Sequence, residues 1–312
     1  MSQTRQNGPE HAYAGAAQRS APALLKARAK ARTKERAERE FRLGATLKRL
    51  GKLNDESLGR IEELQRRTNA PFAHIASSLG LLTREDVETA IGVQNGFIRE
   101  GDGEGRLPQN AVIVRRPKSK EAEQFRAMRT RLLTSSGAEK LNLFAIAGGK
   151  SARASDHVAV NLAASFAQLG RNVLLVDADL RATRLARNFG LEAGPGLRET
   201  LAGETDIRKA IRPTVVSNLS VLTSGALSPS GHELLSHNTL GLTFEYLRCA
   251  FDIVIVMTAP FGPVADAQFV WAAAGGAFIV TRRNHDRMDD LKALNAALRQ
   301  VEASVIGAAL AG

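Results

Sequence analysis

Short apolar runs alternate with amphipathic stretches through the last two thirds of the chain. The runs NVLLVDAD, DIVIVMTAP and AFIVT are continuously apolar, which is typical of strands covered on both faces. The pattern predicts strands at 141–147, 172–177, 218–223, 251–257, 275–281 and 304–310. It predicts helices at 119–135, 156–170, 182–189, 196–202, 230–250, 264–273 and 286–302. Strands separated by helices imply an α/β fold with a doubly wound, mostly parallel sheet, whose ligands bind beyond the carboxyl ends of the strands.

A repeated pattern precedes this region. Gly51-Lys52-Leu53 recurs 29 residues later as Gly80-Leu81-Leu82. Each copy predicts a helix, a turn at the glycine, an N-cap (Asn54 or Asp55 in one copy, Thr83 in the other) and a second helix. Since one such pair of helices cannot bury its apolar face alone, two copies predict a small all-helical domain. We expect a tail at 1–41, disordered or basic and helical, then the helical domain at 42–98, a Gly-rich linker at 99–110 and the α/β domain at 111–312.

Charge and composition narrow the classes of function. The 312 residues carry a formal net charge of +11, and residues 1–40 hold nine Lys/Arg against four Asp/Glu. The basic stretch at 24–41 predicts a solvated helix or linker, with a strip that grips phosphates as the alternative. A single cysteine excludes a disulfide framework and a zinc cluster, and no apolar run is long enough to span a membrane. These features favour a cytoplasmic protein.

A ligand-binding or catalytic site is expected at the carboxyl ends of the predicted strands. A P-loop nucleotide phosphatase would place a Gly-rich loop ending in Gly-Lys-Ser/Thr after the strand that ends at Ala147. In such a loop the backbone amides and the lysine bind phosphate, and the hydroxyl holds magnesium. The second strand ends in Asp177-Ala178-Asp179, which directs two carboxylates to one site. The strand at 251–257 should end in a metal-ordering aspartate.

Four segments resemble the bacterial tyrosine kinases of exopolysaccharide export, within the ParA/MinD group of P-loop ATPases: VLLVDADLRATRL, GPGLRETLAGE, SPSGHELL and FDIVIVMTAP. The resemblance covers about 111–312. It implies a ParA/MinD-like P-loop fold, ATP-dependent protein tyrosine autokinase activity and an inner-membrane polysaccharide co-polymerase (Wzz-like) as partner. Glu123-x-x-Arg126-x-x-Arg129 matches the family's oligomerisation motif. That match implies a homo-oligomer in which the acidic residue of one subunit meets the arginines of its neighbour.

The chain departs from this family where ATP would bind. With Asn161-Leu162-Ala163 as the anchor, the family's Gly-Glu-Gly-Lys-Ser-Thr falls on residues 152–157. Ser155 replaces the lysine, and Asp156 replaces the magnesium-binding hydroxyl with a carboxylate that would repel phosphate. Met257 replaces the metal-ordering aspartate of the third strand. We therefore expect a degenerate nucleotide site with no metal site and no catalytic residues.

The tyrosine cluster of these kinases is also missing. The only tyrosines are Tyr13 and Tyr246, and the chain stops just after its last predicted strand. The sequence therefore predicts neither a phosphate donor site nor an acceptor tail.

An alternative nucleotide site would use Lys150 as its phosphate-binding lysine. Gly148-Gly149-Lys150-Ser151 contains the letters of a P-loop five residues early, and Lys150 falls where the ParA/MinD signature lysine would lie. Using it would leave only Ala147-Gly148-Gly149 between strand and helix, which is too short to wrap a triphosphate. Asp177 and Asp179 are retained, although carboxylates at strand ends also cap the helices that follow.

Residues 42–65 look like the first half of the N-terminal domain of type II secretion and pilus-assembly ATPases, in its MshEN branch. The matching positions are Arg42, Leu43, Gly44, Leu47, Gly51 and Gln65. That branch binds cyclic di-GMP through two such halves, which implies an arginine on guanine and a close backbone approach at Gly44. The second half, at 71–94, begins Pro71-Phe72-Ala73 instead of Arg-Leu-Gly, which weakens the expected binding. The alternative is a helical module that docks a protein.

These observations lead to one hypothesis and two alternatives. We expect a catalytically degenerate relative of the polysaccharide-export tyrosine kinases, acting as a cytoplasmic scaffold or regulator that is peripheral to the inner membrane through its partner. The first alternative is a divergent ATPase that uses Lys150 and the Asp177/Asp179 pair with ATP or ADP and magnesium. The second is a DNA- or membrane-surface positioning protein with residues 19–40 as its electrostatic arm, although the charge distribution disfavours a nucleic-acid partner.

Overall fold

The chain divides into two compact units. The computed structural model describes residues 43–68, 70–98, 104–134, 142–227, 231–236, 238–262 and 266–312. The division falls after Gln94 and gives Met1–Gln94 (unit 1) and Asn95–Gly312 (unit 2). The predicted tail at 1–41 lies outside the described residues, as do Arg42 and residues 99–103 of the predicted linker.

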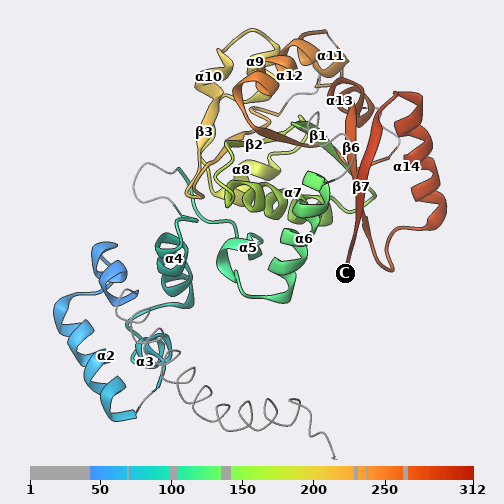
Figure 1. The fold of residues 1–312 in the computed structure, drawn as a ribbon. Coiled ribbons are helices and arrows are strands. Elements are labelled where there is room, and N and C mark those ends of the chain that lie inside the picture. The colour runs from blue at the N-terminus through green and yellow to red at the C-terminus, as the bar shows by residue number, and fades with distance from the viewer. Residues whose placement is uncertain are drawn as a thin grey trace, which may run out of the picture. The chain divides into compact units, whose positions relative to one another are not determined.

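Unit 1 contains two copies of one helical pattern (Figure 1). Residues 43–49 and α2 (Asp55–Thr68) form the first copy, and α3 (Phe72–Ser78) and α4 (Arg84–Gln94) form the second. The first helix of each copy ends in a left-handed glycine, Gly51 with φ +69° and Gly80 with φ +65°. Glycine adopts this conformation without the steric cost of a Cβ atom, which explains its presence at both turns.

Side-chain caps begin the second helix of each copy. Asn54 Oδ1 accepts the N–H of Ser57 at 2.8 Å, so that Asn54 is the N-cap of α2. Thr83 Oγ1 accepts the N–H of Asp86 at 3.1 Å, and the Asp86 carboxylate accepts the N–H of Thr83 at 2.9 Å. The predicted repeat of helix, glycine turn, cap and helix is confirmed.

The core of unit 1 draws on both copies. Its buried members are Leu43, Leu47, Leu53, Ile61, Phe72, Ile75, Ala76, Leu82, Val87 and Ala90. Because neither copy alone supplies enough apolar surface for a core, the two are packed against each other as the repeat predicts.

Unit 2 is built on a seven-stranded sheet in the order β3-β4-β2-β5-β1-β6-β7. Every neighbouring pair is parallel except β3 with β4. The strands are β1 (Leu143–Gly148), β2 (Val173–Asp177), β3 (Ile211–Pro213), β4 (Leu219–Leu222), β5 (Ile253–Met257), β6 (Gly276–Arg282) and β7 (Ser304–Ala311). The predicted doubly wound, mostly parallel sheet is confirmed, and the antiparallel edge strand β3 is an element that the apolar pattern did not predict.

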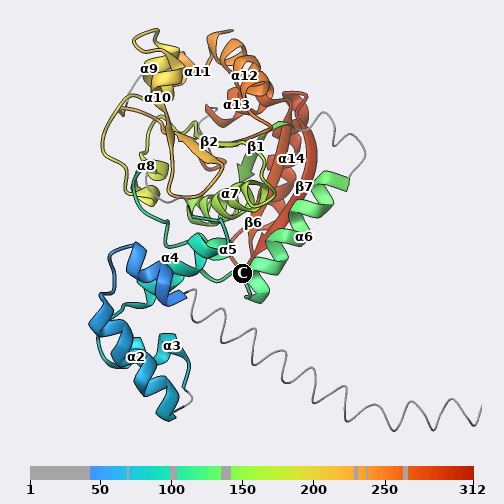
Figure 2. The same ribbon diagram turned by 60° about the vertical axis from the view of Figure 1, so that its left-hand side comes forward.

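Helices cover both faces of this sheet (Figures 1 and 2). One face carries α7 (Ala152–Ala167), with α5 (Val112–Arg115), α6 (Lys120–Thr134) and α8 (Arg184–Phe189) around it. The other face carries α9 (Leu197–Leu201), α11 (Gly231–Ser236), α12 (Asn238–Ala250), α13 (Asp266–Ala274) and α14 (Met288–Gln300), while α10 (Ile207–Ala210) precedes β3. All residues of β1, β2 and β5 are buried, as continuously apolar strands require.

Two predicted helices differ from the observed ones. The helix predicted at 230–250 is two helices, α11 and α12, and residue 237 between them lies outside the described residues. The helix predicted at 156–170 is α7, which begins at Ala152 instead.

Candidate functional site

The segment expected to hold phosphate is the first turn of α7. Only Gly149, Lys150 and Ser151 separate the end of β1 from Ala152. Ser151 is the N-cap, and its hydroxyl accepts the N–H of Ala154 at 3.4 Å. Alanines at 152 and 154 stand where the resemblance predicts the glycines of a phosphate loop, and alanine favours a helix. The helix therefore occupies the chain length that a phosphate loop would need.

Ser155 and the loop glycines are packed tightly together. Ser155, at the position of the missing lysine, is buried and donates to the Ser151 carbonyl at 3.4 Å. A Cβ atom on Gly148 would collide with Oγ of Ser155, and one on Gly149 would lie 2.7 Å from the Asp286 carboxylate. The two glycines thus allow close packing within the protein.

Two backbone donors of this short loop already have acceptors within the protein. Gly149 donates its N–H to the Val280 carbonyl at 3.0 Å, and Lys150 donates its N–H to Oδ1 of Asp286 at 3.1 Å. The other carboxylate oxygen of Asp286 accepts the N–H of Arg282 at 2.7 Å. A carboxylate of the protein therefore takes a donor that a phosphate-binding loop would offer to its ligand.

The Lys150 side chain is paired with α14. Its Nζ lies 2.9 Å from Oδ1 of Asp290, and this hydrogen bond lowers the pKa of Asp290. The side chain is more than half exposed. Lys150 thus has a partner other than the Asp177/Asp179 pair with which the sequence grouped it.

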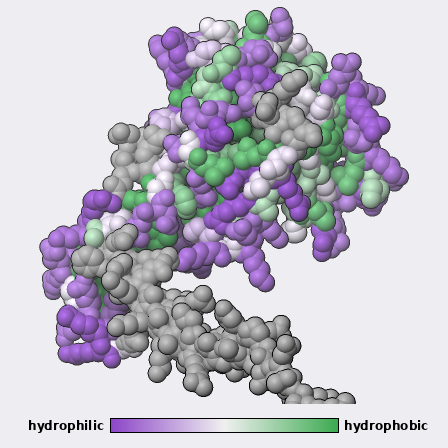
Figure 3. All heavy atoms as spheres, in the orientation of Figure 1, coloured by the Kyte–Doolittle hydropathy of each residue, from purple (hydrophilic) through white to green (hydrophobic). Residues whose placement is uncertain are grey.

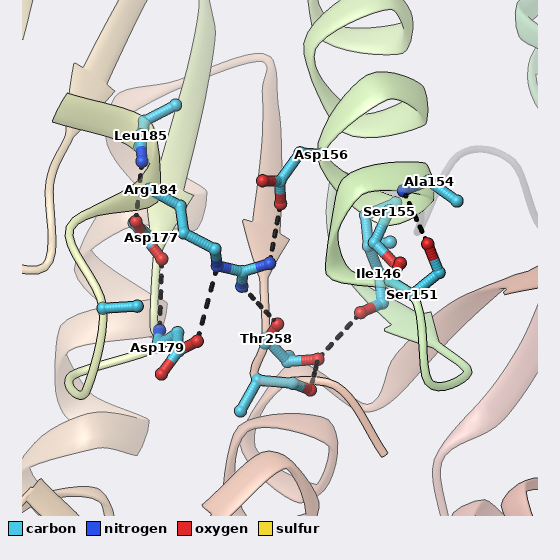
Figure 4. Close-up of polar contacts among 12 residues, drawn as sticks. Ile146, Ser151, Ala154, Ser155, Asp156, Asp177, Asp179, Arg184, Leu185 and Thr258 are labelled. Atoms are coloured by element: carbon cyan, nitrogen blue, oxygen red, sulfur yellow. Dashed lines mark hydrogen bonds and ion pairs between the residues drawn. The ribbon is translucent and has the colours of Figure 1, made fainter. Parts of the chain in front are cut away.

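A buried arginine lies at the centre of the carboxylates (Figure 4). Arg184 Nη1 donates to Asp156 Oδ1 at 2.7 Å, and its Nε lies 3.4 Å from Asp179 Oδ2. Its Nη2 donates to the carbonyl of Thr258 at 2.7 Å. Asp156 lies in α7, which follows β1, Arg184 lies in α8, which follows β2, and Thr258 directly follows β5. One guanidinium therefore connects the segments that follow three neighbouring strands. It supplies positive charge among the carboxylate and carbonyl oxygens at these strand ends.

Asp156 and Asp177 are shielded from solvent in this cluster. Burial raises the pKa of Asp156, and Arg184 opposes that rise. Burial raises the pKa of Asp177 to about 7, again against the attraction of Arg184. Asp177 accepts the N–H groups of Leu185 at 3.0 Å and Asp179 at 3.2 Å. Its carboxyl therefore fixes the loop between β2 and α8.

Met257 ends β5, where the resemblance predicted a metal-ordering aspartate. It lies opposite Ile146 of β1 and Asp177 of β2 in the sheet register, and it is buried. A thioether at this point supplies no oxygen ligand for magnesium. Within the described part of the chain, no group of three His, Cys, Asp or Glu side chains could hold a metal ion.

The predicted oligomerisation motif lies on α6. Arg126 pairs with Glu123 of its own chain at 2.9 Å and also donates to the carbonyl of Pro117. Arg129 donates to the carbonyl of Ser165 on α7 at 2.7 Å, and burial lowers its pKa. Glu123 stays largely exposed. The arginines thus have partners within one chain, and the assembly role of the motif stays a prediction.

The described cyclic di-GMP candidates have structural roles in unit 1. Leu43 and Leu47 belong to its core, and a Cβ atom on Gly44 would lie 2.7 Å from the Leu58 side chain of α2. Gly51 forms the first turn, and Gln65 is half-buried on α2. Arg42 lies outside the described residues. Packing in unit 1 thus explains Leu43, Gly44 and Leu47, and the binding of cyclic di-GMP stays a prediction.

Sequence reasoning missed three residues of this site. Arg184, Thr258 and Asp286 lie far along the chain from the residues they contact. In the sequence, Arg184 could have been recognised as a basic residue that closely follows two carboxylates at the end of a strand, Asp177 and Asp179.

No helix in the described ranges is long and apolar enough to cross a membrane.

Comparisons with known proteins agree with this fold. A family model described as an AAA domain matches residues 143–305. Tyrosine-protein kinase YwqD of Bacillus subtilis (strain 168) is 32% identical over 208 residues, which are 66% of this chain and 87% of that protein. The kinase domain of Escherichia coli tyrosine kinase ETK aligns with a TM-score of 0.62 and 30% identity over 65% of this chain and 79% of that one. The chimerical protein CapA2B2 aligns with a TM-score of 0.60 and 27% identity over 73% of this chain and 98% of that one. The chain therefore belongs to the AAA-domain family and, within it, to the bacterial tyrosine-protein kinases.

Proposed function

We propose that this chain is a catalytically degenerate member of its family, acting as a scaffold or regulator of exopolysaccharide biosynthesis and export. The observation that carries the proposal is the guanidinium of Arg184 between Asp156, Asp179 and the Thr258 carbonyl. An arginine there places a permanent positive charge among the carboxylates, because a guanidinium is not deprotonated in proteins. The helical first turn of α7 supports the same conclusion, since a phosphate loop needs that segment.

A membrane partner and self-assembly complete the proposed role. The family relationship supports an inner-membrane polysaccharide co-polymerase as the partner, and the exposed Glu123 on α6 is available to a neighbouring subunit. Unit 1, with its packed repeat, would contribute a docking or cyclic di-GMP-sensing module. In this role the protein would bind its partners through its surface and would not catalyse a reaction.

Replacing Lys150 tests the scaffold against the divergent ATPase. We expect Lys150→Ala, introduced into the chromosomal copy of the native host, to leave exopolysaccharide yield within about twofold of wild type, because an exposed pair such as Lys150–Asp290 contributes little to stability. The matched control is Lys292→Ala, which removes another exposed lysine of an ion pair involving α14. Loss of polymer with Lys150→Ala but not with Lys292→Ala would favour the ATPase.

A further inference from the structure

The strand β7 forms one edge of the sheet in unit 2 (Figure 1). Its eight residues, Ser304–Ala311, pair with β6 on one side, and no strand in the described part of the chain pairs with the other side. The outward backbone N–H and C=O groups of an edge strand form a template on which a strand of another chain can pair. β7 is therefore a candidate for pairing between molecules.

The two edges of the sheet differ in their protection against such pairing. At the other edge, β3 is only three residues long and contains Arg212 and Pro213, and a short strand, a charge and a proline all hinder pairing. Residues 304–312 contain no charged residue and no proline. The register with β6 shifts once near the start of β7, and the pairing is regular from Gly307 to Ala311. This regular stretch therefore has none of the hindrances found at β3.

Apolar side chains of β7 reach the solvent. Val305 is 45% exposed, Leu310 is 60% exposed, and Ala308 is exposed as well. Hydrophobic atoms come to the surface beside the hydrophilic residues of α14, on the side of unit 2 where β7 lies (Figure 3). Single exposed apolar residues are common on proteins, but here they accompany an unpaired backbone edge on the same strand. A second strand laid along this edge would cover both.

The two ends of the β7 edge carry opposite charges. Glu302 precedes the strand, and Arg283 lies at its far end, where its N–H donates to the carbonyl of Ala311 at 2.8 Å. Both residues are exposed, and neither has an ion-pair partner among the residues described. A strand that runs antiparallel to β7 would need a positive group at its end beside Glu302 and a negative group at its end beside Arg283. A second copy of β7 has this arrangement.

We propose that β7 joins two copies of this chain, edge to edge, about a two-fold axis. The axis makes the two β7 strands antiparallel, so the sheet continues from one copy into the other through backbone hydrogen bonds. Val305 and Leu310 lose exposure in the contact, and Glu302 of each copy meets Arg283 of the other. The matching charges at both ends favour a second copy over an unrelated peptide. This contact is separate from the assembly predicted for α6 and goes beyond the proposed function.

Amide hydrogen exchange of the full chain, combined with sedimentation equilibrium, tests the proposal. As the chain concentration rises from about 1 to about 200 μM, we expect the mass to increase and residues 304–312 to become protected in step with it. Leu310→Lys should raise the concentration of half-protection at least about tenfold, because a lysine on an edge strand opposes pairing. The matched control, Leu242→Lys, changes a leucine of α12 that is 66% exposed and should shift this midpoint by less than about twofold.

Reversing the charges tests the direction of pairing. Glu302→Arg alone, or Arg283→Glu alone, should raise the same midpoint at least about threefold, because each variant brings like charges together at both ends of the contact. The double variant Glu302→Arg/Arg283→Glu should return to within about twofold of wild type, because opposite charges meet again.

Four results would overturn the proposal. The first is exchange at 304–312 that is no slower at about 200 μM than in the monomer. The second is an equal shift of the midpoint in Leu310→Lys and Leu242→Lys, and the third is a double charge variant that associates no better than the single ones. The fourth is protection of 304–312 in a chain that sediments as a monomer, because another segment of the same chain would then cover β7. None of these readouts involves ATP turnover or polymer yield, so the scaffold proposal stands or falls separately.

Discussion

Arg184→Met should lower the free energy of unfolding of unit 2 by about 3–5 kcal/mol. The substitution leaves Asp156 and Asp179 buried without their cation, and breaking a buried ion pair from one side costs about this much. Urea denaturation followed by the fluorescence of Trp271 measures it, because this is the only tryptophan of the chain and it is fully buried in unit 2.

Two further variants separate the ion pair from the loss of side-chain packing. Arg187→Met, on the exposed side of the same helix, should change the free energy of unfolding by less than about 0.5 kcal/mol. Adding Asp156→Asn to Arg184→Met should recover part of the loss, because one uncompensated charge is removed. A loss below about 1 kcal/mol for Arg184→Met would show that the arginine does not hold the cluster together.

Asp177→Asn should gain stability relative to wild type as the pH rises from about 4 to 7. The wild-type carboxyl has a pKa of about 7 in the folded chain and an ordinary value near 3.8 when unfolded. The folded state therefore binds the extra proton in this window, and wild-type stability falls with rising pH by up to about 1.4 kcal/mol per unit. Asparagine carries no titrating proton, so its contribution stays constant.

Urea denaturation at pH 5, 6, 7 and 8 measures this difference, again with Trp271 as the reporter. The variant minus wild-type difference should grow up to about pH 7 and level off above it. Asp289→Asn, which removes a carboxylate that is almost fully exposed, serves as the reference for a change of net charge alone. A difference that stays constant from pH 5 to pH 8 would mean that Asp177 is charged in the folded protein throughout.

The sheet could be predicted because each strand is identified by an apolar run of residues that are neighbours in the sequence. Continuous apolar runs identify buried strands, and the intervening amphipathic helices fix a parallel, doubly wound order. The predicted start of α7 at residue 156 was wrong, since the helix begins four residues earlier at Ala152. Ser151 as a cap and alanines in place of glycines favour the helix, and both features are visible in the sequence.

The centre of the site could not be predicted, because it depends on contacts across the fold. Arg184 meets Asp156 and Thr258 from positions 28 and 74 residues away. The sequence places Arg184 in a helix but does not show which strand ends that helix will face. In unit 1, by contrast, Gly51 and Gly80 mark both turns directly, since only a left-handed residue fits there.

The most direct test of catalytic degeneracy is ATP turnover by the full chain with magnesium. We expect neither phosphate release nor phosphate transfer to tyrosine above the rate without protein, because Arg184 is paired with Asp156 and Asp179 and residues 152–154 are helical. Lys150→Ala should then give the same trace as wild type. Magnesium-dependent turnover that disappears in Lys150→Ala would contradict the account and assign the chain to the active ATPases.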